Sequence, residues 1–133
     1  MKKIFLFVVI ILLFAGCSNN GRGPDLNEIR FEEVNLSDMD WEQVPHPAEP
    51  HGDWSPVVGQ PFSTQEEAGR IANAILEIEQ EHGFFPDFVL FLVRHDFQEN
   101  IWIFIYGETT DPGADFCIAI HGDTGEVIQA WVQ

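Results

Sequence analysis

The residues whose types could support metal binding or nucleophilic catalysis are five histidines and two cysteines. Zinc sites combine His and Cys ligands at short, regular spacings, and no His/Cys pair in this sequence has the spacing of such a site. The histidines are His46, His51, His82, His95 and His121. Cys117 and His121 could act as a thiol nucleophile and its base, but four residues along a strand span about 13 Å, beyond hydrogen-bond reach. The sequence also has no P-loop, dinucleotide fingerprint or serine elbow. We therefore expect no metal, no cofactor and no catalytic residue, and we expect that the chain is not an enzyme.

Cys17 has a definite expected chemistry because of the segment that precedes it. A basic start, Met1-Lys2-Lys3, is followed by the apolar run Ile4–Phe14 of 11 residues. This run is too short to cross about 30 Å of hydrocarbon as a helix, but it is typical of a signal peptide. It ends in Phe14-Ala15-Gly16-Cys17, which is similar to the bacterial lipobox, whose cysteine sulfur receives a diacylglycerol before cleavage.

We expect residues 1–16 to be removed as a lipoprotein signal peptide, and Cys17 to become the lipid anchor. Two or more acyl chains, palmitate among them, would hold the protein stably at the extracytoplasmic face of a cell membrane. The alternatives are an ordinary signal peptide with an unrelated cysteine, or an uncleaved anchor.

The charge balance excludes one class of partner. The formal net charge is −16, and both lysines lie in residues 1–16, so the mature chain keeps four arginines against 22 acidic residues. A strongly negative field repels phosphate, and no Lys/Arg cluster is present to bind it, so we expect no nucleic-acid binding. A basic partner, a cation or a cell-wall component remains compatible with this charge. The acidic residues could also serve only to keep a surface protein in solution.

The mature chain divides into a leader and a domain. Residues 17–60 are acidic and proline-rich, which predicts an extended leader with one short ordered piece near residues 29–36. Trp41 and Trp54 are costly to expose to water, so we expect part of the leader to lie against the domain formed by residues 61–133.

The domain is expected to be an α+β fold, with one helix followed by a four-stranded antiparallel meander. Two overlapping capping boxes, Ser63 with Glu66 and Thr64 with Glu67, mark the start of the helix, and Gly83 marks its end. An apolar stripe at helical spacing follows the start and comprises Ala68, Ile71, Ala72, Ile75 and Ile78. The strand-like segments are residues 88–93, 101–106, 115–121 and 126–132.

Both faces of the predicted sheet are apolar, although one helix can cover only one of them. If the last hairpin pairs His121 with Glu126, Cys117 opposes Ala130, and Trp131 shares a face with Phe116. The second face must then be covered by the leader, by a second copy of the chain or by another protein. If one face is open, the candidate interface residues are Trp102, Phe104, Tyr106 and Trp131.

Residues 63–133 resemble the PepSY-type domain, with its cystatin-like arrangement of a helix on a sheet. The matching motifs are Thr64–Ala68, the strand Ile101–Phe104, and Phe116–Ile120 followed by Asp123–Ile128. The resemblance implies a small, extracytoplasmic, non-catalytic module that binds or restrains a secreted peptidase, or that acts on a cell-envelope component.

A second family is also similar in its order of elements. Immunity proteins of nuclear-transport-factor-two-like fold share a strand with a tryptophan, here Trp102, and turns such as Pro112-Gly113 and Thr124-Gly125. That resemblance implies neutralisation of a bacterial toxin by direct binding. The expected partner is therefore a protein, either a peptidase or a toxin.

Overall fold

The sheet has five strands, one more than the sequence predicts. The computed structural model describes residues 29–108 and 115–133. Its strands follow one another in space in the order of the sequence: β1 (Arg30–Glu33), β2 (Phe88–Asp96), β3 (Ile101–Glu108), β4 (Phe116–His121) and β5 (Val127–Val132). Strands β2 to β5 form the predicted antiparallel meander, whereas β1 comes from the leader and lies parallel to β2. The prediction of a purely antiparallel, four-stranded sheet is therefore wrong, while the α+β class is correct.

Helix α2 (Gln65–Glu81) begins at the second of the two predicted capping boxes. The Thr64 hydroxyl accepts a hydrogen bond from the Glu67 N–H at 3.1 Å, and the Glu67 carboxylate accepts one from the Thr64 N–H at 3.2 Å. These contacts satisfy two backbone donors that the first turn leaves free. The helix ends before Gly83, whose φ of +83° is readily adopted by glycine alone.

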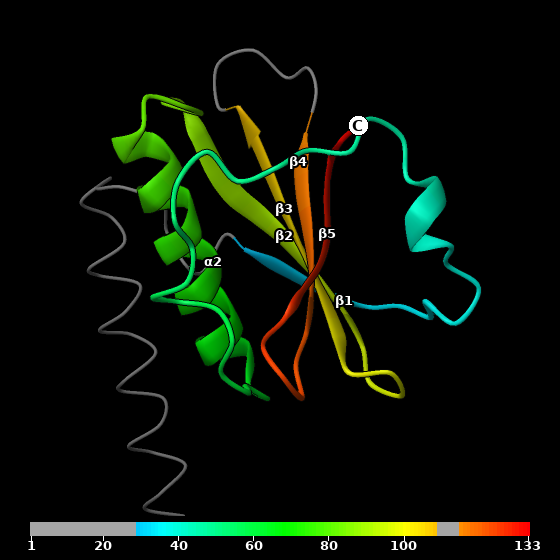
Figure 1. Ribbon diagram of the computed structural model, residues 1–133. Coiled ribbons are helices and arrows are strands. Elements are labelled where there is room, and N and C mark those ends of the chain that lie inside the picture. Colours follow the sequence, from blue (N-terminus) through cyan, green and yellow to red (C-terminus); the bar gives the residue numbers. More distant parts are fainter. Residues whose placement is uncertain (1–28, 109–114) are drawn as a thin grey trace, which may run out of the picture.

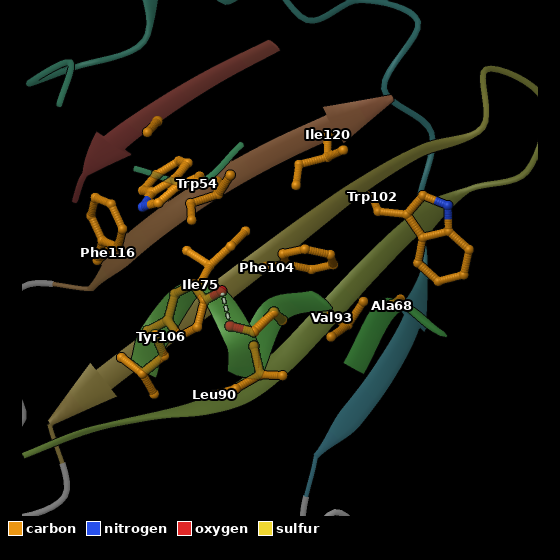
Figure 2. Packing of buried hydrophobic residues seen from close by; sticks show 14 of the residues in the cluster. Trp54, Ala68, Ile75, Leu90, Val93, Trp102, Phe104, Tyr106, Phe116 and Ile120 are labelled. Carbon is orange, nitrogen blue, oxygen red and sulfur yellow. Dashed lines mark hydrogen bonds between the residues drawn. The ribbon is translucent and has the colours of Figure 1, made fainter. Parts of the chain in front are cut away.

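The first face of the sheet packs against α2 (Figure 1). Figure 2 shows side chains from three strands, including Val93, Phe104 and Phe116, in one cluster with Ala68 and Ile75 of the helix. The Tyr106 hydroxyl, which is buried among them, donates a hydrogen bond to the Ala72 carbonyl at 2.7 Å. Burial raises the pKa of Tyr106 well above its ordinary value, so this hydroxyl keeps its proton and acts as a donor.

The second face of the sheet is covered by the leader, as one of the three sequence-based alternatives expected. Leu36 and Val44 pack on Ile103 and its neighbours. Trp41, the first residue of the 3-10 helix η2 (Trp41–Gln43), packs there as well. Figure 1 shows the chain passing from η2 over β5 to the side of α2. Trp54 therefore reaches the opposite face and joins the core beneath the helix. Among the described residues, α2 and the leader together thus cover both apolar faces without a second copy of the chain.

Cys117 lies in the middle of this second face and is fully buried. Burial raises the pKa of the Cys117 thiol to about 12, so the group stays protonated and behaves as a small apolar side chain.

The hairpin between β4 and β5 starts with the predicted pairing. The His121 N–H donates to the Glu126 carbonyl at 2.9 Å, and Gly125 has the left-handed φ of +75° expected in such a turn. Beyond the turn, a β-bulge between Ala119 and Ile120 shifts the register by one residue. Cys117 then pairs with Trp131 instead of Ala130.

The bulge transfers Trp131 to the other face of the sheet. Because side chains alternate along a strand, a shift of one residue reverses the face of every residue that follows. Trp131 consequently packs near Trp41, with ring centroids 6.1 Å apart, and not beside Phe116 as predicted.

Two sequence predictions fall outside the described residues. The signal peptide with Cys17 belongs to residues 1–28, and the Pro112-Gly113 turn belongs to residues 109–114.

Candidate functional site

The four predicted interface residues are core residues in the structure. Trp102, Phe104 and Tyr106 are at most 1% exposed and lie on the face covered by α2, and Trp131 is 6% exposed beneath the leader. The prediction depended on one open sheet face, whereas α2 covers one face and the leader covers the other. In this arrangement the four side chains are buried, although Trp102 reaches the floor of a hollow nearby.

This hollow lies where three distant segments meet, namely β1, the β2–β3 hairpin and the start of α2. It has a volume of about 270 Å³, and its lining residues are Phe31, Glu32, Glu33, Ser63, Gln65, His95, Phe97 and Trp102. We refer to it as the aromatic hollow. Neither the leader nor the domain forms it alone, because β1 supplies one wall and the hairpin supplies the other.

Phe97 is the exposed aromatic residue of the hollow. Its side chain is 64% exposed, more than Phe84 or Met39, the other large apolar residues exposed in the described part of the chain. It occupies the hairpin turn, a position where polar residues are common, and its ring centroid lies 4.4 Å from that of His95. An exposed phenylalanine at such a position is more informative about function than a buried one.

Asp96 holds the hairpin that carries Phe97. Its carboxylate accepts hydrogen bonds from the N–H groups of Gln98 at 2.9 Å and Glu99 at 3.1 Å, and from the Leu36 N–H of the leader at 2.7 Å. These backbone donors, with Leu36 foremost, lower the pKa of Asp96 below its ordinary value. One carboxylate therefore fixes the turn and also attaches the leader beside it.

The inner wall of the hollow is a stack of two rings held by one amide. His95 lies on Trp102 with ring centroids 3.6 Å apart and an interplanar angle of 14°. The Asn100 side-chain oxygen accepts a hydrogen bond from the Trp102 indole N–H at 3.1 Å and lies 2.9 Å from His95 Nε2. Asn100 itself is anchored by a 2.7 Å bond from its amide to Asp123. The wall is thus preorganised by packing and hydrogen bonds.

The rim of the hollow carries two different carboxylates. Hydrogen bonds from Arg30 and Arg94 lower the pKa of Glu32, which forms ion pairs with both. Glu33 pairs in register with His95, so both side chains emerge on the α2 side of the sheet. Glu33 is exposed and forms no ion pair with any described residue. The free negative charge of the rim is therefore that of Glu33.

A second cluster surrounds Glu79, near the other end of α2. This side chain is completely buried, and its carboxylate accepts hydrogen bonds from the Trp54 indole at 2.7 Å and from the backbone N–H of His51 at 3.0 Å and of Gly52 at 3.5 Å. The His51 ring nitrogen Nδ1 lies 2.9 Å away. These groups compensate for the lost hydration of the carboxylate.

The Glu79 cluster acts as a structural clasp. Among the described residues, the groups that hydrogen-bond to the carboxylate all belong to leader residues 51–54, so these bonds fix where the leader crosses the helix. Across residues 29–108 and 115–133, no hydroxyl or thiol shares a hydrogen bond with His51. The pair consequently has no neighbouring nucleophile to activate.

Sequence reasoning missed both Phe97 and Glu79, although each left a signal. Phe97 is an aromatic residue in a turn that otherwise holds polar residues, Gln98 to Asn100. Glu79 follows Ala72 and Ile75 at helical spacing, which places a charge on the buried stripe. Such departures from the expected pattern often mark function or specificity.

No protein-family model matches the sequence, and no curated protein or solved structure is similar enough to count as a match. No helix of the described ranges has the length and apolar character needed to cross a membrane. Within the same ranges, no three His, Cys, Asp or Glu side chains group so that they could hold a metal ion.

Proposed function

We propose that the chain is a lipoprotein anchored through Cys17 at the extracytoplasmic face of a membrane, where it binds a protein partner without catalysis. The aromatic hollow is the proposed contact surface. The observation that carries this proposal is the exposure of Phe97 on a hairpin whose turn is held by the hydrogen bonds of Asp96. Aromatic side chains in such preorganised positions bind with little loss of conformational entropy, and they are frequent anchors of interfaces.

The class of partner follows from the sequence resemblance. A PepSY-like module would engage a secreted peptidase or a cell-envelope component, and this is the partner class we favour. In the alternative, an immunity protein would bind a bacterial toxin. The identity of a protein bound at Phe97 separates the two.

The proposed anchor limits where binding takes place. The chain between Cys17 and Ile29 can extend by at most about 40 Å. Since β1 starts at Arg30 and forms one wall of the hollow, the hollow would stay close to the membrane surface. A partner would then be met at the cell surface and not far from it.

The proposal is tested by photocrosslinking in intact cells. A photoreactive phenylalanine analogue replaces Phe97 in the full-length protein. In a matched strain it replaces Phe84, which is 41% exposed and follows the end of α2, whereas the hollow lies at the start of that helix. We expect position 97 to crosslink a defined protein, identified by mass spectrometry, and position 84 not to do so. Identical products from both positions, or none from position 97, would contradict the proposal.

A further inference from the structure

We infer that the aromatic hollow receives a cationic side chain, arginine or lysine, from the protein partner. This inference rests on the proposed function, because it names the group that the contact surface recognises.

The first argument is the charge at the rim. Glu33 projects on the same side of the sheet as His95 and has no ion-pair partner in the described part of the chain. The two arginines near the rim, Arg30 and Arg94, are already paired with Glu32. The surrounding field has the same sign as Glu33, since the formal net charge is −16, and such a field attracts and orients basic partners.

The second argument is the aromatic lining. Trp102 is covered by the His95 ring on its face, so the rings left to contact a ligand are those of Phe97, His95 and Phe31. A cation near the face of an aromatic ring is attracted by the ring quadrupole, and a carboxylate nearby adds to that attraction. A ring and a free carboxylate on one rim thus suit a long basic side chain, whose stem is apolar and whose head is charged.

The size of the aromatic hollow and the charges at the N-terminus of α2 agree with a basic side chain as the occupant. The hollow, at about 270 Å³, lies near the lower end of the range of small-molecule sites, which starts at about 300 Å³, and it has room for one long side chain. The start of α2 also lines the hollow, and a helix N-terminus by itself favours anions. Here Glu66 and Glu67 occupy the first turn and offset that positive end.

The test uses the mature lipidated protein in neutral detergent and two blocked peptides, Gly-Ser-Arg-Ser-Gly and the same peptide with citrulline. Citrulline keeps the shape of arginine but lacks its charge. Binding is followed by NMR shifts of the Trp102 indole N–H and the Phe97 amide. The variants are Glu33→Gln and Phe97→Ala, and the control is Glu77→Gln, which removes an exposed acidic residue on α2.

We expect the arginine peptide to shift both signals and the citrulline peptide to leave them in place. Glu33→Gln and Phe97→Ala should each weaken binding roughly two- to fivefold, and Glu77→Gln should not change it. Equal binding of citrulline, or equal weakening by Glu77→Gln, would overturn the inference. If position 97 crosslinks a partner while the arginine peptide does not bind, the inferred occupant is wrong and the proposed function stands. If the arginine peptide binds while position 97 crosslinks no partner, the proposed function is rejected and the cation site stands.

Discussion

The indole N–H of Trp54 donates a hydrogen bond of 2.7 Å to the buried carboxylate of Glu79. This contact joins a leader residue to the helix across 25 positions of sequence. It fixes the path over the domain of a proline-rich segment whose regular structure is limited to β1 and η2. The leader is therefore a structural part of the fold, and through β1 it also builds one wall of the aromatic hollow.

The first prediction concerns this clasp. Trp54→Phe keeps an aromatic ring but removes the indole N–H donor. It should lower the free energy of unfolding by about 1–3 kcal/mol, because a buried carboxylate loses a hydrogen bond. Glu79→Gln should cost a similar amount. Urea denaturation of the two single variants and the double variant should give a coupling free energy of about 1–2 kcal/mol. A coupling free energy near zero would show that the indole and the carboxylate act independently. Glu77→Gln, at an exposed position of the same helix, is the control and should leave the free energy of unfolding nearly unchanged.

The second prediction separates the exposed aromatic residue from the buried one. Trp102→Ala leaves a cavity between the sheet and Phe62, and should cost about 3–5 kcal/mol of stability. Phe97→Ala, at a side chain that is 64% exposed, should change stability by about 0.5 kcal/mol or less. The midpoints of urea unfolding measure both. A large loss in Phe97→Ala would mean that Phe97 supports the fold and is not free for a partner.

Local elements of the fold could be predicted from the sequence, whereas features that depend on contacts between distant segments could not. The spacing of apolar residues, the helix capping boxes and the turn residues predicted α2 and β2 to β5, because these are local signals. A short ordered piece near residues 29–36 was predicted, but its pairing as β1 was not, because the strand has four residues and pairs with a strand about 60 positions away. The sheet face predicted for Trp131 was wrong, because a β-bulge leaves no clear local signature in the sequence. The hollow could not be predicted, since it exists only where β1, the hairpin and α2 meet.

The third prediction concerns acid stability through Asp96. Its folded pKa is lowered by backbone donors, so its contribution to stability is complete above the unfolded pKa of about 3.9 and is lost as the pH falls through the lower folded pKa. Asp96→Asn cannot titrate, and its amide presents a donor where the Leu36 N–H also donates. We expect the variant to be less stable at pH 6, with the difference narrowing below about pH 4. Urea midpoints between pH 3 and pH 7 measure this difference, and a gap that stays constant with pH would contradict it.

The fourth prediction concerns the proposed anchor. Cys17→Ser removes the sulfur that would carry lipid, so the protein should leave the membrane fraction and should no longer incorporate labelled palmitate. The control is Cys117→Ser, which alters a cysteine buried in the sheet and should stay in the membrane fraction. Retention of Cys17→Ser in the membrane fraction would show that another segment holds the chain there.

The central claim is that Phe97 and the aromatic hollow form the contact surface for a protein partner. The most direct measurement is the affinity of the purified full-length protein for the partner crosslinked at position 97, compared between Phe97→Ala and the matched variant Phe84→Ala. An anchor residue at the centre of an interface typically contributes 2 kcal/mol or more, so we predict that Phe97→Ala weakens binding by about 30-fold or more and that Phe84→Ala has little effect. Equal affinities of the two variants would contradict the claim.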